Sequence, residues 1–345
     1  MNELHSYHRK ESYMKAFVTG STGLLGNNLV RLLVEQGYDV KALARSRLKA
    51  EQLFSDLPVT IVLGDMYEVN SFASELNGCD VLFHTAAFFR DYYQPGNHWK
   101  ALWDTNVQGT MTLLTAAEQR GVKKVIYVSS SSVIGAGPQN APGDESTPVD
   151  AGRLKNLYSK SKALAEDAID AFLARHTLPV VLILPSAMFG PGDIGPTSTG
   201  RLVQDFLARK IPGIVDGGLS VVDARDIAQI MLTAVEKGKS GERYIASAGY
   251  MAMADVLGVL EKVSGVPAPT RRIPYAATLA YASALEWVWR ITRQPVLVSR
   301  ESVRILHTQR MVSADKATRE LAATFRPFEQ TIRDEVAWYH THQQG

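Results

Sequence analysis

The chain has 345 residues, 46% of them hydrophobic, which is enough for one large α/β core with a smaller appended domain, or for two domains. Its formal net charge of +2 leaves no overall field that would attract nucleic acid or an anionic membrane, so we expect neither as a partner. Cys79, the only cysteine, excludes an internal disulfide framework and a cysteine-based zinc site.

The chain begins with a polar extension over residues 1–13 that has no apolar signal-peptide core. No run reaches the roughly 18 apolar residues of a membrane span, so we expect a cytoplasmic protein. An apolar strand is then predicted at 15–19, followed by a glycine turn and an amphipathic helix over 24–36 that Gly37 ends.

The same alternation of strand and helix recurs along the first half of the chain. It predicts βαβ units, a parallel sheet buried on both faces and therefore a doubly wound α/β fold of Rossmann type. The further strands are predicted at 40–44, 59–63, 81–84, 125–128 and 180–184.

After Pro185 the pattern loosens into glycine- and proline-rich loops, and helices dominate beyond Met251. We therefore predict a dinucleotide-binding domain over 14–187 plus 219–248. A smaller, mostly helical substrate domain would comprise 188–218 plus 249–345. Within it, the apolar segment 275–291 is interpreted as a core-packing helix or a subunit contact.

Three glycines lie between the first strand and the first helix. Gly20 permits a tight turn, Gly23 lets the backbone approach a pyrophosphate, and Gly26 lets the helix pack closely on the strand. The amino terminus of the helix supplies free N–H groups for the phosphates. The turn could be an ordinary one, but its position favours dinucleotide binding.

The end of the second strand bears on the choice of dinucleotide. The chain carries Arg45 and Arg47 there and no acidic residue, and arginine pairs with a 2′-phosphate, whereas a carboxylate accepts from a free 2′-hydroxyl. NADP(H) is therefore preferred and NAD(H) remains possible. Alternatively, both arginines are solvated surface residues. Asp65, after the third strand, is predicted to contact adenine or else to form a plain turn.

Tyr158 and Lys162 are four residues apart in a strongly helical stretch, so they share one helix face. A phenol has a pKa of about 10, and a neighbouring ammonium or a cationic oxidised nicotinamide lowers the pKa of such a group. The pair could also be a solvated amphipathic pair. Four serines, Ser129–Ser132, end the strand before this helix, and a hydroxyl there could hold a substrate carbonyl.

Together these motifs resemble the extended short-chain dehydrogenases/reductases, the NAD-dependent epimerase/dehydratase family, from about Met14 to the C-terminus. The resemblance is carried by Thr19–Gly26, by His84–Ala87, by Asn106–Thr110, by Ser130 with Tyr158 and Lys162, by Pro185–Gly192 and by Val222–Ala228.

The resemblance implies that Tyr158 is the acid/base, that Lys162 lowers the pKa of its phenol and holds the nicotinamide ribose, and that Ser130 binds the reacting oxygen. Ser131 stays open as the active hydroxyl. Asn106 is implied as a supporting active-site residue, or else as a helix cap. The residues implied to bind the cofactor are Gly20, Thr22, Gly23, Leu24, Leu25, Gly26, Arg45, Asp65, Met66, Thr85, Ala86, Ala87, Lys162, Pro185 and Met188, although Pro185 could be a mere strand terminator.

Within the family the chain looks closest to the branch of dihydroflavonol 4-reductases and hopanoid-associated sugar epimerases. A sugar dehydratase would carry an Asp-Glu pair where this chain has Ser131 and Ser132, so dehydration is not expected. We expect an NADP(H)-dependent oxidoreductase that reduces a carbonyl, or oxidises the corresponding alcohol, of a small, ring-shaped or apolar substrate. The alternatives are a nucleotide-sugar epimerase, whose diphosphate clamp could come from Arg201, Arg209, Arg271 and Arg272, and a non-catalytic dinucleotide-sensing relative.

Aromatic residues after the fourth strand, 88–93 with Trp99 and Trp103, are predicted either to form the pocket mouth or to pack the seam between domains. No metal site is expected, because His84 ends a strand and no carboxylate–histidine spacing accompanies His340 or His342. Family resemblance implies a homodimer through the helices that begin near Trp103 and Leu157.

Overall fold

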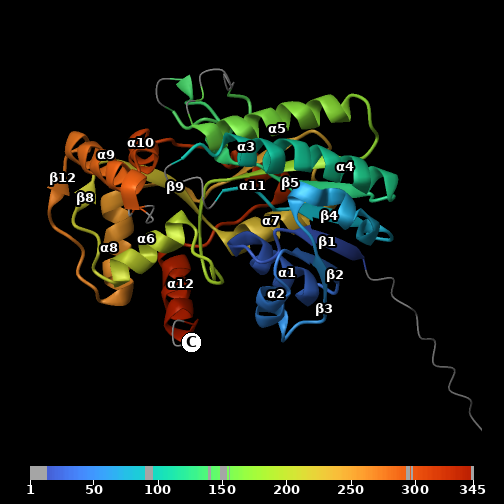
Figure 1. The fold of residues 1–345 in the computed structure, drawn as a ribbon, viewed down its shortest axis with the longest axis horizontal. Helices are drawn as coiled ribbons and strands as arrows, with labels where there is room; N and C mark the ends of the chain where they lie inside the picture. The colour runs from blue at the N-terminus through green and yellow to red at the C-terminus, as the bar shows by residue number, and fades with distance from the viewer. Residues whose placement is uncertain are drawn as a thin grey trace, which may run out of the picture.

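The structure, a computed structural model, describes residues 14–89, 96–138, 141–147, 154, 156–292, 296 and 298–342. The polar extension 1–13 and residues 90–93 of the predicted aromatic segment lie outside the described residues. Figure 1 shows a larger lobe built around a sheet and a smaller lobe of helices and short strands beside it.

The larger lobe contains, within the described residues, a seven-stranded parallel sheet in the order β10-β6-β5-β4-β1-β2-β3. Its strands are short apolar runs, and β4 and β6 are buried throughout. The doubly wound fold and all six predicted strands are confirmed. The strands are β1 (Lys15–Thr19), β2 (Asp39–Ala44), β3 (Val59–Leu63), β4 (Val81–His84), β5 (Lys124–Val128), β6 (Val180–Pro185) and β10 (Arg243–Ala246).

Helices cover both faces of this sheet, which is why its strands are apolar on both sides. One face packs against α4 (Thr110–Gln119) and α5 (Leu157–Leu173), together with the 3₁₀ turns Met66–Ser71 and Ala73–Leu76. The other face packs against α1 (Leu24–Glu35), α2 (Arg47–Phe54), α7 (Ala224–Lys237) and α11 (Asp315–Leu321). A short helix α3 (Trp99–Leu102) and a π-helical segment, Trp103–Gly109, lead into α4.

The smaller lobe has its own core around Phe189, Phe206 and Ile332. It contains two small sheets, β11-β9-β7 and β12-β8, within the described residues. Its strands are β7 (Ala187–Phe189), β8 (Ile214–Val215), β9 (Gly218–Asp223), β11 (Gly249–Ala252) and β12 (Arg272–Ile273). Its helices are α6 (Ser198–Leu207), α8 (Met253–Ser264), α9 (Tyr275–Thr292), α10 (Arg300–His307) and α12 (Phe328–His342).

The segment 219–248, predicted to belong to the dinucleotide-binding domain, is divided between the two lobes. β10 joins the main sheet beside β6, and α7 packs with the main core. β9 instead pairs with β7 and β11 in the three-stranded sheet. The chain therefore crosses between the lobes inside this segment.

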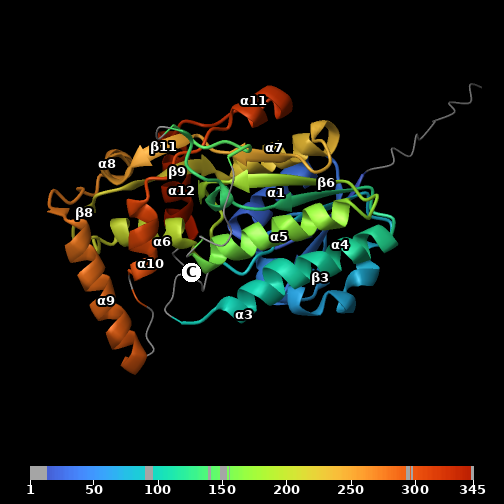
Figure 2. The same cartoon turned by 90° about the horizontal axis from the view of Figure 1, so that it is seen from above.

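Helix α9 is not a core-packing helix, so that interpretation of 275–291 was wrong. Its only buried residues are Thr278 and Ala282, whereas Trp287 is 63% exposed and Ile291 68% exposed. The reason is that α9 carries apolar side chains all around its axis, while only one of its sides packs against the rest of the protein. Figure 2 shows α9 projecting at the edge of the smaller lobe. The other interpretation, a subunit contact, stays a prediction.

The strand order indicates where a ligand-binding crevice lies in this sheet. β1 lies between β4 and β2, so the chain winds outward in opposite directions from the junction of β1 and β4. In doubly wound sheets the loops at the carboxyl ends of such neighbouring strands separate, and ligands bind in the crevice between them.

Candidate active site

A cavity of about 990 Å³ opens at this junction. Both lobes line it: the larger lobe with the loops that follow β1, β2, β4 and β5, the smaller lobe with residues from β9 and α10. With the exception of Asn106, all the predicted catalytic and cofactor-binding residues line this cavity. The fold therefore brings together motifs that are separated by as much as 168 positions, since Gly20 and Met188 both contribute.

The glycine turn after β1 has the geometry of a phosphate cradle. Gly20 has a φ of +66°, in the left-handed region, and a Cβ there would lie 2.7 Å from the Ala86 nitrogen. A Cβ on Gly26 would lie 2.2 Å from the Gly20 carbonyl oxygen, so helix α1 can approach the turn only without a side chain. Gly23 is the residue directly before helix α1. The first N–H groups of this helix have no partner within the helix, and its amino-terminal end lies at the cavity.

We expect Gly26→Ala to destabilise the fold by about 1–3 kcal/mol, because the added methyl group must push backbone apart, and to weaken dinucleotide binding. Gly258→Ala in α8 is the matched control, since a Cβ there meets nothing within 4 Å and alanine favours helix. Urea unfolding and an NADPH fluorescence titration of both variants measure the two effects. Equal stability of the two variants would contradict the close-packing argument.

The loop after β4 is tied to the end of β1 by hydrogen bonds. Thr85 Oγ1 donates to the Thr19 carbonyl oxygen at 2.7 Å, and the Ala86 nitrogen donates to Thr19 Oγ1 at 3.2 Å. His84 is buried between Thr19 (2.8 Å) and Thr110 (3.0 Å), and burial, with the nearby charge of Lys162, lowers its pKa to about 3. His84 is therefore a neutral structural residue, and among the described residues no group of His, Cys, Asp and Glu side chains suits a metal ion.

Three charged side chains line the cavity at the ends of β2 and β3. Arg45 is 79% exposed, and its Nη1 lies 4.0 Å from Asp65 Oδ2. Asp65 also caps the following 3₁₀ turn by accepting from the Tyr67 nitrogen at 3.1 Å. Lys49, on the first turns of α2, lines the same region and was missed by the sequence analysis. Arg47 does not line the cavity and pairs with Glu51 at 3.7 Å.

Tyr158 lies in the first turn of α5 and faces the cavity. Its ring makes an edge contact with Phe89, with centroids 4.8 Å apart. The helix begins where Asn156 caps it, since Asn156 Oδ1 accepts from the Ser159 nitrogen at 2.8 Å. Asn156 Nδ2 in turn donates to Glu301 of α10 at 2.8 Å, which ties α5 to the smaller lobe.

Lys162 lies one turn along α5 and is 1% exposed. Its ammonium donates to the Val128 carbonyl at 2.8 Å and to the Tyr127 hydroxyl at 3.3 Å, and it lies 4.9 Å from the centre of the Tyr127 ring. Burial lowers the pKa of Lys162 to about 7, against the opposing effect of Glu166. The solvated-pair alternative is therefore excluded for Lys162.

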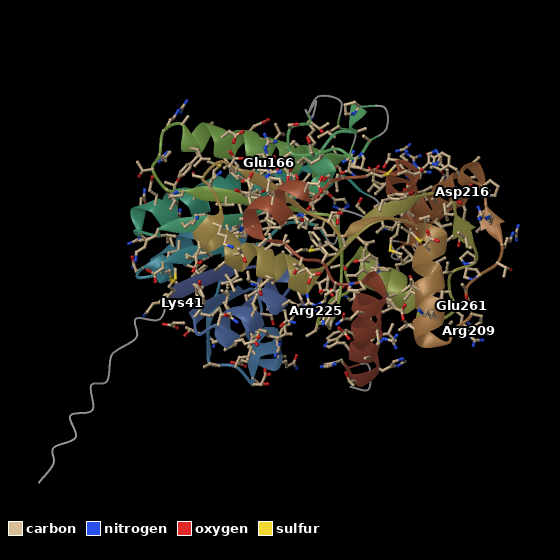
Figure 3. All side chains as sticks on the ribbon, turned by 180° about the vertical axis from the view of Figure 1, so that it is seen from behind. Lys41, Glu166, Arg209, Asp216, Arg225 and Glu261 are labelled. Atoms are coloured by element: carbon tan, nitrogen blue, oxygen red, sulfur yellow. The ribbon has the colours of Figure 1, made fainter. Side chains whose placement is uncertain are left out.

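A buried carboxylate, Glu166, lies one turn further along α5 and was not singled out by the sequence analysis. It accepts a hydrogen bond from Ser129 and pairs with Arg243 of β10 at 3.3 Å. Burial raises its pKa to about 7, while its partners act in the opposite direction. Figure 3 shows Glu166 in the larger lobe, on the side of the sheet that α5 covers. The i, i+4 spacing from Lys162 was the available signal.

The four serines after β5 have different surroundings. Ser129 is engaged with Glu166, and Ser130 Oγ accepts from the Ser132 nitrogen at 3.2 Å, capping a short 3₁₀ turn. All four line the cavity, with Ser130 more exposed than Ser131. Ser132 Oγ is buried and has no hydrogen-bond partner among the described residues. The assignment of the active hydroxyl to Ser130 rather than Ser131 stays a prediction.

Asn106 does not line the cavity; it lies within the π-helical segment and is 1% exposed, so it is not a helix cap. Its Oδ1 accepts from the Phe88 nitrogen at 2.8 Å, and its Nδ2 donates to the Phe88 carbonyl and to Ser161 Oγ at 3.3 and 3.0 Å. Asn106 thus fastens the loop after β4 to helix α5. The supporting role predicted for Asn106 in the active site stays a prediction.

The predicted aromatic residues separate into two groups. Phe88 and Phe89 line the cavity. Trp99 and Trp103 do not; their rings lie 6.0 Å apart, and Lys160 of α5 lies over Trp99. Of the aromatic residues predicted after β4, the described ones that line the cavity are therefore Phe88 and Phe89.

The smaller lobe supplies lining residues that the sequence analysis missed. They follow no local motif and come from the late segments around α9 and α10: Tyr275, Glu301, Arg304, Ile305, His307, Thr308 and Arg310. None of the four arginines considered for a diphosphate clamp, Arg201, Arg209, Arg271 and Arg272, lines the cavity in the described structure. Figure 3 shows Arg209 in the smaller lobe, away from the main sheet.

Known proteins with similar sequences also indicate a dinucleotide-binding family. The model of the NAD dependent epimerase/dehydratase family matches residues 16–247. The chain belongs to this family. A Synechocystis sp. protein that bears the name dihydroflavonol 4-reductase is 34% identical over 94% of both chains. Sterol demethylase protein B of Methylococcus capsulatus is 31% identical over 94% of this chain and 98% of that protein.

Among solved structures, gox2253 matches 95% of this chain and 98% of its own with a TM-score of 0.80 and 31% identity. The predicted family and the fold are thereby confirmed, and the protein is an NAD(P)-dependent oxidoreductase of the short-chain dehydrogenase/reductase type. Within the described residues, every helix is too short or too polar to cross a membrane. The homodimer and the cytoplasmic location stay predictions.

Proposed function

We propose that the protein is an NADP(H)-dependent carbonyl reductase that uses Tyr158, Lys162 and Ser130. The observation that carries the proposal is that Tyr158 faces the cavity while Lys162 lies buried one turn along the same helix, held by the Val128 carbonyl. Tyrosine and lysine in this relation form a proton-transfer unit, because an ammonium favours the phenolate.

The residues present fit a dinucleotide. Any side chain at Gly20 or Gly26 would collide with backbone, and Gly23 opens helix α1 at the cavity, so the turn offers N–H groups to a pyrophosphate without steric obstruction. Pro185 and Met188, which also line the cavity, would border the nicotinamide. When bound, the dinucleotide would donate the hydride to a substrate carbonyl carbon, or accept it in the reverse direction.

The protein's own groups would handle the oxygen and the proton. Ser130 would donate a hydrogen bond to the carbonyl oxygen, and Tyr158 would donate its hydroxyl proton to that oxygen as negative charge develops there. Lys162 would stabilise the phenolate left behind. Asn106 would keep the loop after β4 against α5, so that Phe88 and Phe89 border the substrate.

The preference for NADP(H) rests on the charges at the end of β2. Arg45 and Lys49 line the cavity there, and Asp65 is already engaged by the Tyr67 nitrogen and by Arg45. A 2′-phosphate would gain two cationic partners, whereas a free 2′-hydroxyl would find its nearest acceptor occupied.

Reduction is favoured over epimerisation by two considerations. The Synechocystis relative bears the name of a reductase, and Arg201, Arg209, Arg271 and Arg272, considered for a diphosphate clamp, lie outside the cavity lining. A reductase exchanges its cofactor each cycle, whereas an epimerase can return the hydride to the same substrate without releasing it. The proposal therefore predicts that purified protein carries little nucleotide.

This prediction is checked by denaturing the purified protein and measuring released nucleotide by chromatography against protein concentration. We expect well under one equivalent of nucleotide per protein chain. With added NADPH, the protein should reduce members of a panel of carbonyl compounds, which is followed by the loss of NADPH absorbance. One equivalent of retained NAD, with no carbonyl reduced, would instead support the epimerase.

A further inference from the structure

Arg310 is a cavity-lining arginine whose charge the proposed mechanism does not use. Its Nη1 donates to the Ser132 carbonyl oxygen, and the side chain makes no other hydrogen bond or ion pair with a described residue. Burial lowers the pKa of its guanidinium. A guanidinium carries five N–H donors, and leaving donors without partners in a partly buried site is costly. The remaining donors therefore call for an acceptor in the cavity.

The backbone holds Arg310 firmly in this place. Its carbonyl oxygen accepts from Ser220 Oγ of β9 at 3.1 Å. The next residues form a bridge with Gly143, whose nitrogen donates to the Met311 carbonyl at 3.0 Å. Gln309, just before, has a φ of 45°, the left-handed conformation that commonly ends a helix, here α10. These contacts fix the backbone at Arg310, and the hydrogen bond to the Ser132 carbonyl orients its side chain.

Arg310 lies on the substrate side of the cavity. Its side chain donates to Ser132 in the three-residue turn Ser131–Val133, which Ser130 caps, and the Cα atoms of residues two positions apart are at most about 7 Å apart. The phosphates of the dinucleotide belong to the glycine turn after β1 and to Arg45, on other strands. An acceptor at Arg310 would thus be close to the carbonyl that Ser130 binds.

The charge balance of the cavity favours an anion there. Its described lining carries five cationic side chains, Arg45, Lys49, Lys162, Arg304 and Arg310, and two carboxylates, Asp65 and Glu301. Glu301 accepts from Asn156 and lies 3.8 Å from Arg304, while Asp65 pairs with Arg45. Arg310 is therefore a partly buried cation on the substrate side that neither carboxylate neutralises.

We propose that Arg310 binds a carboxylate of the substrate, so that the preferred substrates are oxo acids whose carboxylate lies a few carbon atoms from the reacting carbonyl. This inference rests on the proposed carbonyl reduction and names its substrate class. The planar fork of arginine matches the two oxygens of a carboxylate, which lysine does not reproduce.

The test compares straight-chain oxo acids, with the carbonyl at carbon 3, 4 or 5, with their methyl esters in NADPH-dependent reduction. We expect the wild type to favour at least one acid over its ester by 10-fold or more in kcat/KM. Arg310→Met should raise KM for that acid by roughly 10- to 100-fold, because a hydrogen bond to a charged group is lost. KM for the methyl ester should stay within about threefold of the wild-type value. Arg310→Lys should fall between the two, and Arg319→Met, an exposed charge on α11, should match the wild type.

A merely structural role for Arg310 would impair acid and ester equally, and that result, or a wild type that prefers the esters, would overturn the inference. Circular dichroism shows whether Arg310→Met is folded. If it is not, the same comparison of acid with ester is made with Arg310→Lys. Calorimetric titration of hexanoate, which has no carbonyl to reduce, into protein saturated with NADP⁺ separates the two proposals. Weaker binding of hexanoate by Arg310→Met, without turnover of any carbonyl by the wild type, would retain the Arg310 site and refute the reductase.

Discussion

Tyr158→Phe should lower kcat by about 100- to 10,000-fold, because it removes the hydroxyl that we propose donates the proton while leaving the ring and its contact with Phe89. Lys162→Met should slow the reaction and move the pH optimum upward. The sign follows from the charge: a protonated lysine favours phenolate, and without it the phenol ionises only at higher pH, toward the ordinary pKa of about 10.

The effects of the two substitutions should not be additive, since we propose that Tyr158 and Lys162 act as one unit. We expect the double variant to be little slower than Tyr158→Phe alone. Ser130→Ala should be milder, because water or Ser131 can supply one hydrogen bond. Steady-state kinetics of any accepted carbonyl across pH 5 to 10 measures all four variants.

The controls are Tyr281→Phe, on the exposed side of α9, and Lys160→Met, on α5 two residues before Lys162 and outside the cavity lining. Both should retain wild-type rates, and circular dichroism should show every variant folded. A Tyr158→Phe enzyme with full activity would remove the central residue from the mechanism.

Arg45→Asp should weaken binding of NADPH by roughly 10- to 150-fold, the equivalent of about 1.5 to 3 kcal/mol for one lost hydrogen bond between charged groups, and strengthen binding of NADH. The carboxylate would repel a 2′-phosphate and accept from a free 2′-hydroxyl. Stability should hardly change, because Arg45 is 79% exposed and its 4.0 Å contact with Asp65 is a surface pair.

Fluorescence titration of both cofactors into wild type and variant gives the four dissociation constants. Arg47→Asp is the matched control: it makes the same charge change two residues away, at a side chain that pairs with Glu51 and does not line the cavity. We expect it to leave the ratio of NADPH to NADH affinity unchanged. Tighter binding of NADH than of NADPH by the wild type would refute the NADP(H) assignment.

The sequence by itself determined the alternation of strands and helices, the glycine turn and the Tyr158–Lys162 pair. Each is a local property: short apolar runs specify strands, Gly20 and Gly26 specify a close backbone approach, and a spacing of four specifies a shared helix face. Local rules also placed Arg45 at the end of β2, because the side chain that follows a strand lies at its carboxyl end.

The tertiary structure alone decided what these motifs face. Glu301 and Arg310 reach the cavity because the smaller lobe folds its late segments onto the carboxyl ends of β5 and β6, and no periodicity within 298–313 predicts that approach. It also decided that Asn106 fastens a loop and that α9 lies exposed. Contacts between residues more than a hundred positions apart depend on how whole elements pack, which local sequence pattern does not encode.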